Sequence, residues 1–94
     1  MEIRSVKHKG LRRFIENDDH SGLPAKFVEK IRDIVTALLI AENISDLPGL
    51  PGWRLHPLKG SRKGQWSIVL TGNMRIVFEV RDNEIYKMTL EDYH

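Results

Sequence analysis

The clearest pattern of apolar positions lies in residues 24–42. Pro24 is accepted in the first turn of a helix, which we expect to run to about Glu42. A partner helix could bind the apolar stripe of this helix, but packing against the core of the same protein is favoured. Six residues form the stripe at spacings of three and four: Phe27, Ile31, Ile34, Val35, Leu38 and Leu39.

The N-terminal part predicts two shorter elements before this helix. Residues 1–6 form a strand candidate, and residues 11–15 suggest a short helix that ends in a polar loop at residues 18–22. After the long helix, residues 46–52 contain two Pro-Gly pairs and predict a loop. This loop separates a helical half from a strand half.

The second half of the chain alternates between apolar and polar residues. Short turn sequences at residues 71–73 and 81–83 predict tight hairpins, and successive hairpins imply an antiparallel sheet. The expected class is therefore α+β, with an N-terminal strand and two helices packed on an antiparallel sheet. Four strand candidates follow one another, at residues 53–58, 65–70, 74–80 and 84–90.

Length and composition limit the range of possibilities. A chain of 94 residues allows a single domain, 1–94, with a modest core. Cysteine is absent, the longest apolar run is too short to cross a bilayer, and the first residues lack the apolar region of a signal peptide. We expect a cytoplasmic protein that makes no membrane contact.

The net charge of +2 hides an uneven distribution. Between residues 47 and 78 there are five basic residues and no acidic one: Arg54, Lys59, Arg62, Lys63 and Arg75. A region of one sign attracts a polyanion, although scattered surface lysines would give a similar count. Arg62 and Lys63 are thus either contacts to mRNA or rRNA or solvated turn residues.

The last residues, Asp92, Tyr93 and His94, directly follow the final strand candidate. Chain ends usually tolerate change, so a titratable cluster here indicates a site. His56 and Lys59 lie near the end of another predicted strand, and in a meander such ends can meet. Arg75 lies near a hairpin and can join them.

These residue types suit RNA cleavage without a metal or another cofactor. A base is needed to activate the 2′-hydroxyl and an acid to protonate the departing 5′-oxygen. Fixed cations such as Lys59 and Arg75 stabilise the phosphate as its charge grows, and Tyr93 can bind a phosphate oxygen or stack on a base. The histidines lack the spacing of a metal site.

Six segments together resemble the HigB toxins of the RelE/ParE superfamily, over nearly the whole chain. One position differs, since Met74 stands where relatives commonly have tryptophan before the arginine. The segments are Lys7-His8-Lys9-Gly10-Leu11, Ser21-Gly22-Leu23-Pro24-Ala25, Leu55-His56-Pro57-Leu58-Lys59-Gly60, Gly64-Gln65-Trp66-Ser67-Ile68, Asn73-Met74-Arg75-Ile76 and Glu91-Asp92-Tyr93-His94.

The resemblance implies a RelE-like microbial RNase fold and a type II toxin that cleaves mRNA in the ribosomal A site during translation. It implies a 2′,3′-cyclic phosphate and a 5′-hydroxyl as product ends, and no metal or cofactor. The implied partner is a HigA-type helix-turn-helix antitoxin, through which alone operator DNA is contacted. The implied active-site positions are His56, Lys59, Asp92, Tyr93 and His94, with Arg75 on the phosphate.

Our hypothesis gives His94 or Asp92 the role of base and His56 that of acid, and the two roles can be exchanged. Two other functions stay open. A gyrase poison of the ParE type would share the fold without needing this acid–base set. A non-catalytic RNA-binding module would need only the basic residues.

Overall fold

The computed structural model describes residues 1–47 and 53–92 and confirms the α+β class. No helix in these residues is long and apolar enough to cross a membrane. The helical segments are α1 (Lys9–Asn17), α2 (Val28–Ile40) and the 3₁₀ turns η1 (Ala25–Phe27), η2 (Ile44–Asp46) and η3 (Gly60–Arg62). The strands are β1 (Glu2–Ile3), β2 (His56–Pro57), β3 (Gln65–Val69), β4 (Met74–Arg81) and β5 (Glu84–Asp92).

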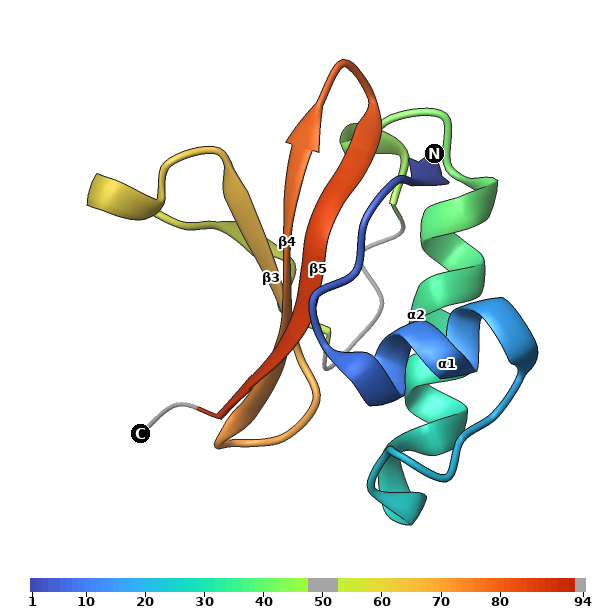
Figure 1. Cartoon of the computed structure of the whole chain (residues 1–94). Helices are drawn as coiled ribbons and strands as arrows, with labels where there is room; N and C mark the ends of the chain where they lie inside the picture. The colour runs from blue at the N-terminus through green and yellow to red at the C-terminus, as the bar shows by residue number, and fades with distance from the viewer. Residues whose placement is uncertain (48–52, 93–94) are drawn as a thin grey trace.

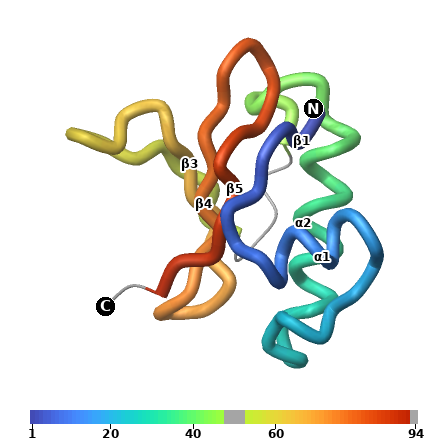
Figure 2. The backbone as a smooth tube through the Cα atoms, in the orientation of Figure 1, coloured from blue at the N-terminus to red at the C-terminus, as the bar shows by residue number. Residues whose placement is uncertain are grey.

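The strands form one sheet in the order β1-β5-β4-β3-β2. The antiparallel order predicted for the strands of the second half is confirmed in β2 to β5. Strand β1, whose direction was not predicted, lies parallel to β5, so the sheet is mixed (Figure 2). Parallel neighbours need a long connection, and here both helices and three strands lie between β1 and β5. The pairing continues at an isolated parallel bridge between Val6 and Met88.

The two predicted hairpins are confirmed. Asp82 and Asn83 link β4 to β5 with φ angles of 51° and 60°. Positive φ at both central residues is typical of the type I′ turn, whose twist matches that of the strands it joins. The backbone N–H of Leu70 donates to the carbonyl of Met74 at the β3–β4 turn.

Strand β2 is shorter than the strand predicted for residues 53–58. Arg54 has a φ of 47°, outside the extended region, and Pro57 has no N–H to donate to a neighbouring strand. Proline is tolerated here because β2 is an edge strand. The short strand nevertheless holds His56 opposite Ser67 of β3.

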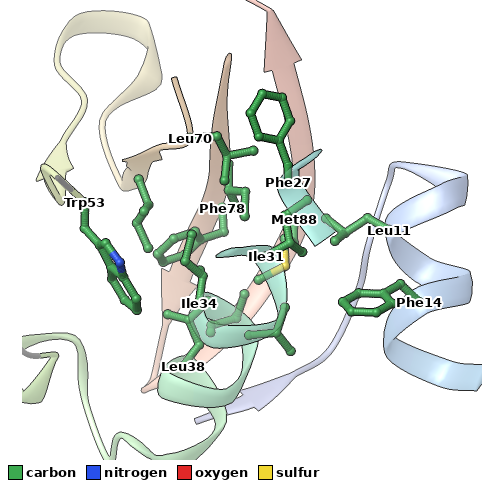
Figure 3. Packing of buried hydrophobic residues seen from close by; sticks show 14 of the residues in the cluster. Leu11, Phe14, Phe27, Ile31, Ile34, Leu38, Trp53, Leu70, Phe78 and Met88 are labelled. Atoms are coloured by element: carbon green, nitrogen blue, oxygen red, sulfur yellow. The ribbon is translucent and has the colours of Figure 1, made fainter. Parts of the chain in front are cut away.

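Both helices cover one face of the sheet (Figure 1). The side chains of Ile31, Ile34 and Leu38 on α2 are fully buried and pack with Phe78 and Met88 of the sheet (Figure 3). Leu39 was predicted to belong to this stripe, but it is 50% exposed. Consecutive helical residues are turned by about 100°, so Leu38 faces the sheet while Leu39 faces solvent.

A close contact between two glycines fixes the start of α1. His8 caps the helix, since its Nδ1 accepts a hydrogen bond of 3.0 Å from the N–H of Leu11. The backbone of Gly10 lies directly against that of Gly22. A Cβ built on Gly10 would lie 2.8 Å from the carbonyl carbon of Gly22.

We expect the Gly10→Ala substitution to lower the free energy of unfolding by about 1–3 kcal/mol, because one backbone must move away from the other. Thermal unfolding followed by circular dichroism measures this effect. Gly72→Ala is the matched control, because a Cβ at Gly72 meets no atom within 4 Å. Equal stability of the two variants would contradict the prediction.

A polar sheet face as candidate active site

The face of the sheet turned away from the helices carries three of the predicted site residues, since His56 and Arg75 lie on it and Arg62 reaches onto it. His56, Ser67, Val77 and Thr89 form one row across β2 to β5, and Val69, Arg75 and Glu91 form a row two residues further along. Rows two residues apart share a face, and the intervening row of Ile68, Ile76 and Leu90 packs on the core. We call this surface the polar face, formed by His56, Gln65, Ser67, Arg75, Glu79, Thr89 and Glu91.

Glu91 joins two of the predicted basic residues on the polar face. Its Oε1 accepts hydrogen bonds from Arg62 Nη1 at 3.0 Å and Arg75 Nη2 at 3.1 Å, and its Oε2 pairs with Arg62 Nη2. Arg62 Nε also donates to Gln65 Oε1 at 3.0 Å. The cluster is partly buried, with side-chain exposures of 36% for Arg62, 28% for Glu91 and 17% for Arg75.

The two arginines shift the titration of Glu91. Hydrogen bonds from Arg62 and, to a smaller extent, Arg75 lower the pKa of Glu91, and the same carboxylate raises the pKa of Arg62. All three groups are therefore charged at neutral pH, and together they carry one net positive charge. The polar face keeps a cationic centre even with an acid among its residues.

This pKa shift predicts a pH-dependent stability. A carboxyl group with a lower pKa in the folded state stabilises the fold above its unfolded pKa, and this stabilisation is lost as the pH falls through the folded value. Between about pH 6 and about pH 3, we expect the free energy of unfolding of the unaltered chain to fall by about 1 kcal/mol more than that of Glu91→Gln. The difference is small because the ion pairs are partly exposed to solvent. Denaturant unfolding across this range measures the difference, and identical pH slopes would contradict it.

His56 lies at the edge of the polar face, on β2. Its Nε2 is 3.3 Å from the hydroxyl of Ser67, which is fully buried, and its Nδ1 is 3.3 Å from the carbonyl oxygen of Pro57. A carbonyl only accepts, so Nδ1 is the donor in its contact with Pro57, while Nε2 faces the hydroxyl of Ser67. Both contacts are long, which leaves the exposed ring free to take a substrate oxygen instead.

Lys59 and Lys63 flank the turn η3, in the β2–β3 connection that projects from the sheet on the side opposite the helices (Figure 1). Gly60 and Gly64 supply the positive φ angles of this connection, 67° and 94°. Both lysines are exposed, whereas Arg62 of the same turn reaches back to Glu91. The connection thus brings one cation onto the polar face and leaves two at its rim.

The terminal motif is described only in part. Asp92 is the last residue of β5, paired with Met74, and it is exposed. Alternation along β5 places Asp92 on the opposite face from Glu91, at the end of the sheet. Tyr93 and His94 lie outside the described residues.

Glu91, Ser67 and Gln65 were not predicted as members of this cluster. Glu91 belongs to the terminal motif, but its position directly opposite Arg75 becomes visible only when the register of β4 and β5 is known. Ser67 carried no signal, because a serine in an alternating strand gives no indication of a histidine opposite it. Both follow from strand pairing.

The polar face is an open surface. Its depression, lined by residues that include Arg62, Gln65 and Glu91, has a volume of about 50 Å³, too small for a nucleotide. A larger hollow of about 420 Å³ lies beside α1 and α2, where it is remote from His56. Among the described residues no three His, Asp or Glu side chains are placed to hold a metal ion. A surface without a large pocket, with Lys59 and Lys63 at its rim, suits a polymer bound along it.

Comparison with known proteins gives one family. A family model described as the RelE-like toxin of type II toxin–antitoxin system HigB matches residues 4–94. The chain is 42% identical to Endoribonuclease HigB of Proteus vulgaris over 92 residues, which cover 98% of this chain and 99% of that protein.

Solved structures agree on the fold. YafQ of Escherichia coli is 14% identical, with a TM-score of 0.60 over 97% of this chain and 93% of YafQ. A YoeB–YefM complex of Staphylococcus aureus contains a chain that is 20% identical, with a TM-score of 0.59 over 100% of this chain and 99% of that chain.

Proposed function

Because the chain belongs to the HigB-like family of RelE-like toxins of type II toxin–antitoxin systems, we propose that it is an endoribonuclease that cleaves mRNA on the ribosome. Cleavage of mRNA in the A site inhibits translation and needs no metal. A protein antitoxin of the helix-turn-helix HigA type neutralises the toxin in the cytoplasm and is its link to operator DNA.

The observation that carries this proposal is the common face of His56, Arg62 and Arg75. A titratable imidazole and two guanidinium groups lie on one open surface, as an acid–base reaction on a phosphodiester requires. A gyrase poison has no use for an imidazole and paired arginines on one face of the sheet. A module that only binds RNA would need the cations but not His56.

In the proposed reaction His94, or Asp92 acting from the end of the sheet, takes the proton of the 2′-hydroxyl, and the 2′-oxygen attacks the neighbouring phosphorus. The bond from phosphorus to the 5′-oxygen breaks, and His56 supplies the proton to that oxygen. The products end in a 2′,3′-cyclic phosphate and a 5′-hydroxyl. The roles of the two acid–base groups can be reversed.

The cations and the aromatic ring assist this reaction. Arg75 and Lys59 stabilise the phosphate as its negative charge grows, while Arg62 and Lys63 bind neighbouring phosphates or rRNA. Tyr93 positions the nucleotide. An open surface positions a flexible RNA poorly, so the ribosome has to hold the mRNA in a reactive geometry.

Mapping mRNA ends after induction of the chain tests the proposal. We expect cuts within translated codons that leave 5′-hydroxyl ends and that disappear when translation initiation is blocked. A chain without His94 should give few of these cuts. DNA supercoiling measured on the same cells would change instead if the protein poisoned gyrase, and cleavage of naked RNA at an equal rate would remove the ribosome from the proposal.

A further inference from the structure

We propose that Glu91 is a positioning residue of the RNA site, which holds Arg62 and Arg75 in a fixed arrangement for one phosphate. This inference rests on the proposed function, because it assigns a task within the same site. Glu91 itself touches neither substrate nor reacting atoms in this proposal. It acts through the two guanidinium groups that it binds.

The hydrogen bonds fix Arg62 more than a single ion pair would. Arg62 offers three nitrogens, and each has a protein acceptor: Nε bonds to Gln65, while Nη1 and Nη2 both bond to Glu91. A guanidinium has five N–H groups, so two of Arg62 stay available for a phosphate after these bonds are made. Their directions are set by the plane that Gln65 and Glu91 define.

Glu91 also connects two elements of the chain, the turn η3 and the strand β4, through their arginine side chains. Arg62 belongs to η3 in the projecting β2–β3 connection, and Arg75 belongs to β4. The Oε1 atom of Glu91 accepts from both, at 3.0 Å and 3.1 Å, and thereby holds the two guanidinium groups side by side. Lys59 lies at the start of the same connection, shortly after β2 with His56, so Glu91 restrains the segment that follows both residues.

The negative charge of Glu91 distinguishes a role in positioning the arginines from a role in attracting RNA. A carboxylate among cations weakens the attraction for RNA, so a site selected for binding alone would be better without it. Fixed geometry lowers the barrier of the chemical step, since small displacements of a catalytic group can cost about a hundredfold in rate. Loss of the charge should therefore lower kcat while KM stays equal or falls.

The same strand offers a matched control. Glu84, at the other end of β5, holds Arg4 with bonds from Arg4 Nε and Nη2, and this pairing also lowers the pKa of Glu84. The two carboxylates thus share strand, partner type and direction of pKa shift. Of the two, only Glu91 bonds to Arg62 and Arg75.

The test compares Glu91→Gln and Glu84→Gln with the unaltered chain on programmed ribosomes, at a temperature where all three are folded. For Glu91→Gln we expect kcat to fall at least tenfold with KM equal or lower, and for Glu84→Gln both constants should stay within twofold. Glu91→Asp, which keeps the charge on a shorter side chain, should recover part of kcat. In NMR spectra the Nε–H signal of Arg62 should exchange faster with water in Glu91→Gln than in the unaltered chain.

Three results would overturn the inference: kcat and KM both unchanged in Glu91→Gln, a raised KM with normal kcat, or an equal loss in Glu84→Gln. A loss that matches the unfolded fraction measured by circular dichroism would reduce Glu91 to a structural residue. The measurement on the unaltered chain alone shows whether the protein cleaves mRNA at all. Absence of cleavage there would remove the proposed function itself and the inference with it.

Discussion

His56→Ala is expected to cleave ribosome-bound mRNA about 10² to 10⁴-fold more slowly than the unaltered chain, which is the usual contribution of one positioned acid or base. His56 lies on the rim of the polar face, and its ring contacts only Ser67 and Pro57 through long hydrogen bonds. Its side chain is exposed, so the substitution removes little packing. Single-turnover kinetics with saturating toxin measures the chemical step directly.

His20→Ala serves as the control, because His20 is an exposed histidine in the connection between α1 and η1. It should cleave at the rate of the unaltered chain. His56→Ala should also lose one limb of the pH–rate profile, since the group that titrates on that limb is gone. A normal rate with a normal profile would exclude His56 from proton transfer and favour a role for His94 and Asp92 alone.

Local patterns in the sequence predicted the elements of this fold well. The stripe of Ile31, Ile34 and Leu38 identified α2, and the turn at Asp82 and Asn83 identified the last hairpin. These signals work because a helix or a tight turn is decided by neighbouring residues. The error at Leu39 arose where the stripe of α2 borders solvent, and a list of apolar residues does not define that border.

Pairings between distant segments were not predictable in the same way. The parallel placement of β1 beside β5 and the contact of Gly10 with Gly22 depend on the final packing. The resemblance to HigB toxins indicated both glycine-containing segments but gave no reason for them. The structure supplies the reason, because a side chain at Gly10 would collide with the backbone of Gly22.

In the candidate site, too, the chemistry of single residues was predictable from the sequence, whereas contacts between distant segments were not. Residue type and charge identified His56, Lys59, Arg62 and Arg75 as candidates, since imidazole and guanidinium chemistry can be read from the sequence. The acidic partner of the arginines was not identified, because Glu91 comes from β5, which is distant in the sequence from both of them. The register of the sheet therefore determines the charge of the site.

Arg75→Lys is expected to lower kcat by about 10² to 10³-fold, although it keeps the positive charge. Loss of one fixed donor to a developing oxyanion has an effect of this size. Arg75 lies near the start of β4 with a side-chain exposure of 17%, and it bonds to Glu91 through Nη2. Lysine has a single ammonium group on a flexible stem, so it cannot bond Glu91 and present further N–H groups in one plane.

Arg81→Lys is the matched control, since Arg81 lies at the other end of β4 and forms an exposed pair with Glu79 at 3.1 Å. Its cleavage rate should equal that of the unaltered chain. Binding of an RNA with 2′-O-methyl groups, which cannot be cleaved, should differ little between Arg75→Lys and the unaltered chain, because phosphate attraction depends mainly on charge. Full activity of Arg75→Lys would show that Arg75 acts only as a point charge. A large loss of RNA binding would show instead that its guanidinium group binds the ground state of the substrate more than the transition state.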